Sequence, residues 1–296
     1  MTKILVTGVS GGIGKRTVDH LLKKGVQANQ IIGLARKIEG VEDLAGKGIE
    51  IRIGDYFDYG SLLRAFEGVD KIMLTSAVAF TDRFTQHYNV ITAGRQAGVK
   101  HVAYMSIMRK EGSGRIMPGI TESDLFTEQV LKSSGLDYTI LYHPPFTDVL
   151  AANYGVDPYK NGIKVPASNG KVAPASRDEL AEAHAVVLST PGHENRTYSL
   201  GGSTAVSYSD IAKILADAKG QPVPFTTITA EEYIDMRVAE GLPVNVAEFL
   251  TAWITAIDGG EFEYQSGDIE LLLGRKTKNL REFIESTQAL ISPEVS

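Results

Sequence analysis

The sequence predicts an α/β protein built on a doubly wound parallel sheet, with a smaller α+β lobe toward the C-terminus. Strand-like and helix-like segments alternate through the first half, and a glycine-rich turn joins the first strand to the first helix. Such alternation indicates βαβ units, which place their strands in parallel. We expect one lobe over residues 1–150 and a second over 151–296, with some later segments returning to the first lobe.

The strands expected in the first lobe are short apolar runs bounded by polar residues or glycine. They lie at Ile4–Thr7, Ile31–Ala35, Ile49–Ile53, Lys71–Ser76, His101–Ser106 and Leu136–Leu141. Apolar residues at helical spacing predict helices between them, at Gly14–Lys24, Ser61–Phe66, Tyr88–Ala97 and Thr121–Ser134. Ser61 is the expected N-cap of its helix.

The pattern changes after Pro144, where prolines interrupt a loop-rich stretch. Ser176 followed by Glu179 has the spacing of a capping box and predicts a helix start. The elements expected in this part are helices at Ser176–Ser189, Ser207–Lys219, Glu231–Glu240 and Val246–Ile257, and a strand at Thr197–Leu200.

Composition narrows the classes of function. The chain has no cysteine, which excludes disulfides and thiolate chemistry, and none of its 6 histidines pairs with another at metal-ligand spacing. The net charge of −6 argues against a nucleic-acid partner. No segment approaches the ~18 apolar residues of a membrane helix, and the first apolar run is too short for a signal peptide. We expect a cytoplasmic protein without a metal site or membrane association.

The glycine turn carries the most specific signal. It comprises Gly8, Val9, Ser10, Gly11, Gly12, Ile13 and Gly14. In a Rossmann-type dinucleotide site the first glycine makes the turn, the second admits a pyrophosphate, and the third lets helix and strand pack closely. A tight turn without a ligand is the alternative. The segment also matches the G-x-S-x-G hydrolase elbow, but that elbow normally follows a mid-chain strand, so we favour nucleotide binding.

Arg36 ends the second expected strand, twenty-two residues after Gly14. An acidic residue there would bind ribose hydroxyls, whereas an arginine presents a planar fork to a 2′-phosphate. Arg36 therefore favours NADP(H) over NAD(H). Asp55 follows the third strand, where it is either a contact of the adenine amino group or a turn residue.

The Tyr-x-x-x-Lys pair of short-chain dehydrogenases does not occur in the chain. That pair supplies the proton for carbonyl reduction. Its absence favours acceptors that take hydride without an obligatory enzyme acid, such as quinones, dyes and conjugated cations.

Together these residues resemble the NmrA-like, atypical short-chain dehydrogenase/reductase group, in its NAD(P)H:quinone oxidoreductase and triphenylmethane reductase branch. The resemblance runs over nearly the whole chain, and the glycine turn and Arg36 are its specific parts. It implies a substrate cleft between the two lobes. It also implies NADP(H) contacts from Gly8–Ile13, Arg36, Thr75 and Ser76, and from the loop after the sixth strand.

That loop departs from the family pattern. It reads Tyr142-His143-Pro144-Pro145-Phe146 where relatives usually read Leu-Arg-Asn or Leu-Arg-Pro after the strand. Asp124 and Gln129 likewise stand where relatives often carry His and Lys. His143 is either a proton donor near neutral pH or a structural histidine. Tyr142 and Ser106 are the other catalytic candidates, although Ser106 also fits a loop cap.

The leading hypothesis is an NADPH-dependent reductase that passes hydride to a small, flat, conjugated acceptor such as a quinone, a dye or an enone. One alternative is a redox sensor that binds NADP(H) without turnover. Another is an isomerase or a ketoreductase with His143 as its acid. Apolar helix faces are compatible with a homodimer.

Overall fold

A computed structural model describes residues 1–155 and 157–287. Residue 156 and residues 288–296 of the expected second lobe lie outside the described residues. A seven-stranded sheet runs through the first lobe in the order β3-β2-β1-β4-β5-β6-β9, with every pair parallel. Its strands are β1 Ile4–Thr7, β2 Ile31–Ala35, β3 Glu50–Ile53, β4 Lys71–Leu74, β5 His101–Ile107, β6 Asp137–His143 and β9 Arg196–Ser199.

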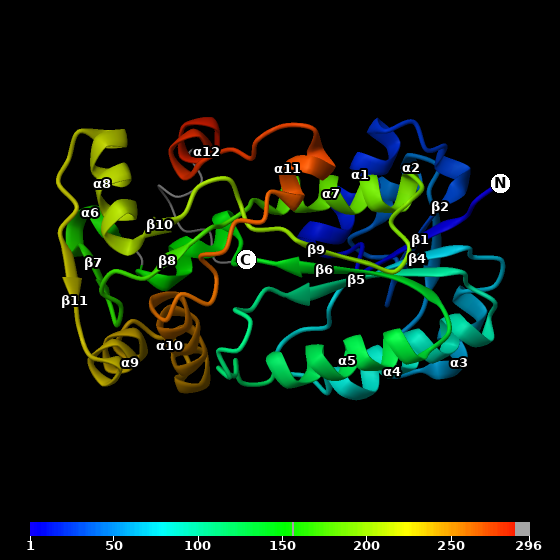
Figure 1. Ribbon diagram of the computed structural model, residues 1–296, viewed down its shortest axis with the longest axis horizontal. Coiled ribbons are helices and arrows are strands. Elements are labelled where there is room, and N and C mark those ends of the chain that lie inside the picture. Colours follow the sequence, from blue (N-terminus) through cyan, green and yellow to red (C-terminus); the bar gives the residue numbers. More distant parts are fainter. Residues whose placement is uncertain (156, 288–296) are drawn as a thin grey trace.

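Helices cover both faces of this sheet, as Figure 1 shows. One layer holds α1 Gly12–Lys23, α2 Glu42–Gly46, α7 Arg177–Ser189 and α11 Asp268–Leu273. The opposite layer holds α3 Tyr59–Ala65, α4 Arg83–Gln96 and α5 Thr121–Ser133. This arrangement confirms the predicted doubly wound α/β fold.

The central strands are apolar along their length because both faces are covered. All residues of β1 and β2 are buried. On one face they pack with Val18 and Leu21 of α1 and with Leu180 of α7. On the other face they pack with Leu62 of α3 and Val90 of α4. The sheet therefore has one core on each of its sides, and the second lobe has a core of its own.

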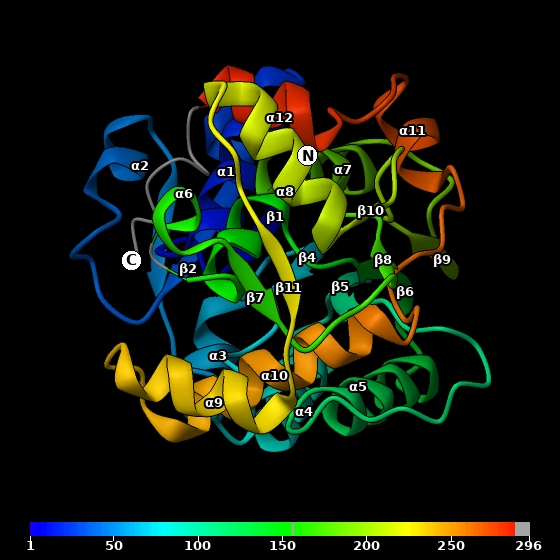
Figure 2. The ribbon, with the colours of Figure 1, turned by 90° about the vertical axis from the view of Figure 1, so that its left-hand side faces the viewer.

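The second lobe is smaller and mixed (Figure 2). Strands β8 and β10 pair antiparallel, and β7 and β11 pair parallel. Its elements are the 3-10 helix Thr147–Asn153, α6 Pro158–Asn161, β7 Ile163–Val165, β8 Lys171–Val172, β10 Val206–Ser207, α8 Tyr208–Lys219, β11 Phe225–Thr227, α9 Ala230–Ala239, α10 Val244–Asp258 and α12 Leu280–Thr287; the one-turn segment Ala28–Gln30 precedes β2 in the first lobe.

Several helix starts differ from the prediction. Helices α1 and α10 each begin two residues earlier, at Gly12 and Val244. Helix α3 begins earlier, because the Asp58 side chain accepts a hydrogen bond from the Ser61 amide at 3.0 Å and so serves as the N-cap in place of Ser61. Helix α4 begins at Arg83, with Asp82 as its N-cap. The predicted N-cap at Ser176 is present, since its hydroxyl accepts from the Glu179 amide at 3.2 Å.

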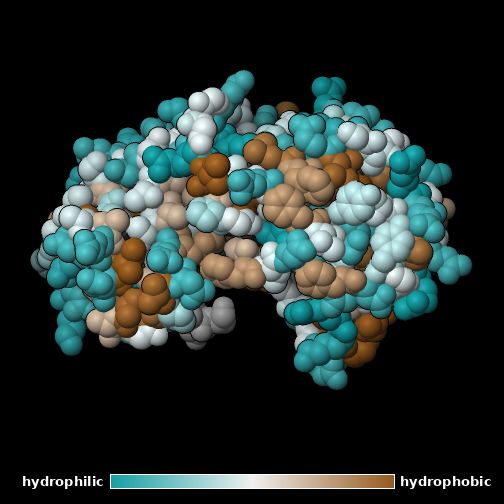
Figure 3. Space-filling view, turned by 90° about the horizontal axis from the view of Figure 1, so that it is seen from below, coloured by the Kyte–Doolittle hydropathy of each residue, from teal (hydrophilic) through white to brown (hydrophobic). Residues whose placement is uncertain are grey.

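The first lobe is not continuous in sequence. The chain leaves it after β6, returns with α7 to pack beside α1, and then adds β9 to the edge of the sheet. The carboxyl ends of β5 and β6 face the second lobe (Figure 1). Seen from below, the outline is indented between the two lobes (Figure 3). Within residues 1–155 and 157–287, no helix has the length and apolar character needed to cross a bilayer.

Candidate active site

The glycine turn has the backbone geometry that its three spaced glycines predict. Gly8 has a φ of +64°, and the Gly11 N–H donates to the Gly8 carbonyl oxygen at 2.9 Å. A Cβ at Gly14 would lie 2.4 Å from that same oxygen. Helix α1 therefore approaches β1 this closely only because residue 14 is glycine.

The first turn of α1 presents its amides toward the surface. Gly11 is the N-cap, and no side chain caps the helix. Ser10, Gly11 and Gly12 are exposed, and the buried Val9 and Ile13 anchor the turn to the core. An anion above this turn would meet several N–H donors and the positive end of the helix dipole.

Arg36 and Asp55 follow the neighbouring strands β2 and β3. Arg36 is exposed, and its guanidinium has no hydrogen-bond or ion-pair partner in the described part of the chain. Asp55 Oδ1 accepts a hydrogen bond from the Phe57 amide at 2.8 Å, which makes Asp55 a turn residue. A contact between its other carboxylate oxygen, Oδ2, and the adenine amino group stays a prediction.

Thr75 and Ser76 follow β4, at the point where the strand order reverses between β1 and β4. The Thr75 hydroxyl donates to the Thr7 carbonyl at 3.1 Å, and the Thr75 amide donates to the Thr7 hydroxyl at 2.9 Å. The Ser76 hydroxyl donates to the Met105 carbonyl. Ligands of open parallel sheets bind at such a reversal, which lies beside the glycine turn.

A pocket of about 360 Å³, which we call the strand-end pocket, opens at the carboxyl ends of β4, β5 and β6. Its wall from the second lobe is Phe249, Leu250 and Trp253 of α10. Trp253 also stacks on Phe262, with ring centroids 5.2 Å apart. The predicted site residues that line it are Ser76, Ser106, His143, Pro144, Pro145 and Phe146. The lining is mainly apolar, with a few polar groups at the strand ends.

His143 is buried in the floor of this pocket, and both of its ring nitrogens are engaged. Nδ1 lies 2.9 Å from the Leu141 carbonyl oxygen, which accepts only, so Nδ1 carries the proton. Nε2 lies 2.8 Å from His184 Nε2, and His184 Nδ1 lies 3.2 Å from the Thr17 hydroxyl. Burial lowers the pKa of His143 to about 4. These contacts favour a structural histidine over a proton donor.

Ser106 and Tyr142 both hydrogen-bond the buried Glu128 of α5. Ser106 Oγ donates to Oε1 at 2.7 Å, and Tyr142 Oη donates to Oε2 at 3.0 Å. Arg109 pairs with both Glu128 oxygens at 2.8 Å and lies over the Tyr142 ring. Burial, followed by the Glu128 charge, raises the pKa of Tyr142 to about 12. The Tyr142 hydroxyl is therefore a protonated donor committed to Glu128.

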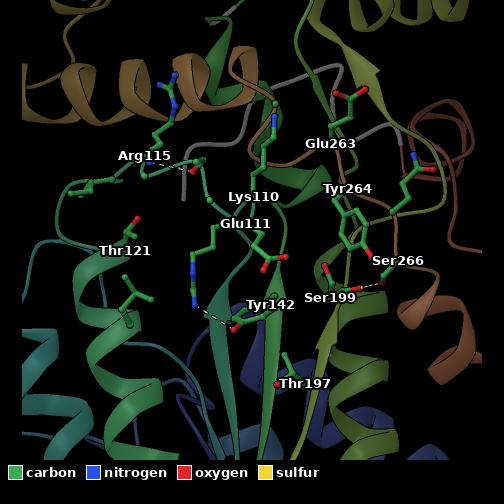
Figure 4. Close-up of a pocket in the computed structure, with 18 of the residues that line it drawn as sticks. Lys110, Glu111, Arg115, Thr121, Tyr142, Thr197, Ser199, Glu263, Tyr264 and Ser266 are labelled. Carbon is green, nitrogen blue, oxygen red and sulfur yellow. Dashed lines mark hydrogen bonds between the residues drawn. The ribbon is translucent and has the colours of Figure 1, made fainter.

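Tyr142 faces a second, larger cavity of about 1310 Å³, which we call the side groove. Figure 4 shows Tyr142 at its floor, with Lys110, Glu111 and Arg115 above it and Thr197 and Ser199 of β9 beside it. The groove and the strand-end pocket share no lining residue. The structure therefore separates Tyr142 from the side of β6 where His143 lies. The groove has the larger volume, but the strand-end pocket is lined by Ser76, which follows the strand reversal, and by Arg177, which lies beside Gly12.

Asp124 lines the strand-end pocket one helical turn before Glu128, and its significance is not evident from sequence. Its Oδ1 accepts from the Tyr104 hydroxyl at 2.6 Å and from Arg83, and its Oδ2 accepts from the Ile107 amide at 2.9 Å. Burial raises the pKa of Asp124, and the Arg83 charge opposes that rise. The ion pair between Arg83 of α4 and Asp124 of α5, together with the hydrogen bond from the Ile107 amide, holds the end of β5 against these two helices.

Sequence reasoning did not identify four further lining residues, Arg83, Arg177, Phe249 and Trp253. Periodicity predicts α10 as an amphipathic helix, but it does not say which surface that helix covers. Arg177 directly follows the predicted N-cap Ser176. Its place at the start of a predicted helix is the one sequence feature that could have indicated a role in the site.

The described residues fit a dinucleotide cofactor. Ser10, Gly11 and Gly12 leave the turn exposed, and the first turn of α1 has no side-chain cap. Within the described residues, Arg36 beside β2 has no hydrogen-bond or ion-pair partner. These groups match a pyrophosphate and a ribose phosphate. No cluster of three metal-ligating side chains occurs within the described ranges.

Comparisons with known proteins agree with this geometry. A family model described as NAD(P)H-binding matches residues 8–191. Quinone oxidoreductase 2 of Escherichia coli is 32% identical over 95% of this chain and 97% of its own length. Its structure with NADPH has a TM-score of 0.90 at 30% identity, covering 96% of this chain and 99% of that one.

A second solved relative is the triphenylmethane reductase of Citrobacter sp. It is 34% identical to this chain, with a TM-score of 0.89 and coverage of 97% of this chain and 99% of that one. The NAD(P)H azoreductase of Xenophilus azovorans is 24% identical over 97% of this chain and 98% of its own length. The chain therefore belongs to the NAD(P)H-binding, NmrA-like oxidoreductase family.

Proposed function

We propose that the protein is an NADPH-dependent reductase whose acceptor is a flat, conjugated molecule such as a quinone, a dye or an enone. The observation that carries this proposal is the strand-end pocket, whose lining includes Arg177 beside Gly12 and whose second wall is formed by aromatic residues of α10. A mainly apolar pocket with few polar groups suits a planar organic ligand. NADPH supplies the hydride, and the protein holds the acceptor and excludes water.

Preference for NADPH rests on Arg36. Its exposed guanidinium, which has no partner among the described residues, follows β2, where the adenosine ribose of a dinucleotide lies in this fold. Charge-assisted hydrogen bonds to a 2′-phosphate contribute about 1.5–3 kcal/mol. That range corresponds to a preference over NADH of roughly tenfold to a hundredfold.

The proposed class of acceptor follows from the hydrogen bonds that already engage the polar groups of the pocket. His143 has no free ring nitrogen, and Asp124 and Ser106 already hydrogen-bond protein groups. An acceptor that needs no strong enzyme acid suits such a site. Three relatives point the same way, since they are a quinone oxidoreductase, a triphenylmethane reductase and an azoreductase.

The test is oxidation of NADPH and of NADH, followed at 340 nm with purified protein against quinones, triphenylmethane dyes, azo dyes and conjugated carbonyls. We expect NADPH-selective turnover with at least one of these classes. NADP(H) binding without any turnover would overturn the reductase and favour a redox sensor. Turnover that does not discriminate between NADPH and NADH would overturn the role of Arg36.

A pair of variants tests the location of the acceptor. Phe249→Ala removes a ring from the strand-end pocket, whereas Tyr264→Ala removes a ring that is 63% exposed in the side groove. Loss of an aromatic contact should lower kcat/KM for the acceptor about tenfold in Phe249→Ala. Tyr264→Ala should stay within about twofold of the unmodified protein. The reverse pattern would place the acceptor in the groove.

A further inference from the structure

Arg177, the first residue of α7, lies between the glycine turn and the strand-end pocket. A Cβ built on Gly12 would lie 3.7 Å from Arg177 Cδ and 3.9 Å from its Nη1. On its other side the guanidinium lies over the Phe146 ring, 5.4 Å from the centroid. Arg177 also lines the pocket itself. One cation therefore borders both parts of the site.

The partner of Arg177 is an acidic residue from the loop after β6. Arg177 Nη1 lies 2.9 Å from Asp148 Oδ2, and the Arg177 amide donates to Asp148 Oδ1 at 3.3 Å. The Arg177 side chain is 34% exposed, and that of Asp148 is 20% exposed. Across the described residues no other acidic group pairs with this guanidinium, whose five N–H donors leave several free for an anion.

A dinucleotide that places its pyrophosphate at the turn and its nicotinamide in the pocket must pass Arg177. The adenosine end lies toward Arg36, on the other side of the turn. Of the two phosphates, the one attached to the nicotinamide ribose is therefore nearer the pocket. A planar guanidinium presents paired donors to phosphate oxygens, and a partly exposed ion pair can yield to such a competitor.

We propose that Arg177 binds the nicotinamide-side phosphate of NADP(H), and that Asp148 holds the guanidinium in place until the cofactor arrives. This inference rests on the proposed orientation of NADP(H) in the preceding section. Arg177 is thereby a positioning residue, because it fixes the phosphate next to the ring that must reach the pocket. Asp148 keeps the side chain ordered, but its negative charge opposes the phosphate.

The competing explanation is that the Arg177–Asp148 pair only ties α7 to the loop after β6. The two explanations predict different signs for two variants that break the same ion pair. Arg177→Gln removes the phosphate ligand, whereas Asp148→Asn removes only the competitor. A purely structural pair would make both variants bind the cofactor less well, and to a similar extent.

The experiment measures dissociation constants by calorimetry for NADPH and for adenosine 2′,5′-bisphosphate, which lacks the nicotinamide-side phosphate. For Arg177→Gln we expect about tenfold weaker NADPH binding and unchanged bisphosphate binding. Asp148→Asn should bind NADPH as tightly as the unmodified protein or up to about threefold more tightly. Arg177→Lys, which keeps the charge, should recover part of the affinity.

Two further variants serve as controls. Arg16→Gln removes an equal charge that also lies beside Gly12, and it should weaken both ligands slightly and alike through the general electrostatic field. Arg36→Gln should weaken both ligands strongly. Unchanged NADPH binding in Arg177→Gln, or equal weakening in Arg177→Gln and Asp148→Asn, would overturn the role of Arg177. Failure of the unmodified protein to bind NADPH would instead overturn the proposed function.

Discussion

The strand-end pocket and the side groove lie on opposite sides of the carboxyl ends of β5 and β6, yet they differ in chemistry more than in position. The groove is several times larger, but its charged residues are mostly exposed. The smaller pocket has a buried ion pair, a buried histidine pair and an aromatic wall. The free-energy cost of burying charged and polar groups around a cavity therefore says more about its role than its volume does.

The largest expected effect concerns the buried ion pair. Asp124→Ala leaves Arg83, whose side chain is 6% exposed, without its carboxylate. Breaking such a pair should lower the free energy of unfolding by about 3–5 kcal/mol. Glu263→Ala in the groove removes an exposed carboxylate and should change it by less than about 0.5 kcal/mol. Urea unfolding of the two variants checks the contrast, and equal losses would contradict it.

The histidine pair predicts a dependence of stability on pH. Burial lowers the pKa of His143 to about 4, whereas an unfolded chain has a histidine pKa of about 6.5. The unfolded state thus binds more protons below pH 6.5, so the free energy of unfolding falls as pH falls toward 4. His143 alone should contribute a loss of about 2 kcal/mol at pH 5. Urea midpoints measured from pH 8 to pH 5 test this, and His143→Gln should flatten the slope.

The smallest effect is expected for Tyr142→Phe. The variant removes one hydrogen bond to Glu128, which keeps its contacts with Arg109 and Ser106. We expect a loss of about 1 kcal/mol in the free energy of unfolding and less than a twofold change in kcat/KM. A loss of kcat of tenfold or more, with an altered pH profile, would instead make Tyr142 the proton donor and join the groove to the active site.

The sequence predicts the cofactor half of the site better than the acceptor half. The glycine turn is local, because the spacing of Gly8, Gly11 and Gly14 determines its own backbone geometry. The fold class follows from the alternation of strands and helices for the same reason. The short strands of the second lobe have two or three residues each and show no periodicity to detect.

The acceptor half depends on contacts between distant segments. Phe249 and Trp253 line the same pocket as Phe146, more than 100 residues away in the chain, and Arg177 lies beside Gly12 although 165 positions separate them in sequence. Neighbouring strand residues also point to opposite faces, so Tyr142 and His143 enter different cavities although they are adjacent in sequence. The order of residues alone does not reveal which face each cavity occupies.

The late return of the chain to its first lobe has a consequence for synthesis. Helix α7 covers α1 and one face of the sheet, and β9 closes the edge, so a nascent chain that has reached only residue 150 leaves those apolar surfaces open. At roughly 5–20 residues per second, the ribosome needs a few more seconds before α7 emerges. During that interval the growing chain exposes apolar surface that favours aggregation. An N-terminal fragment ending at residue 150 would keep this vulnerability permanently.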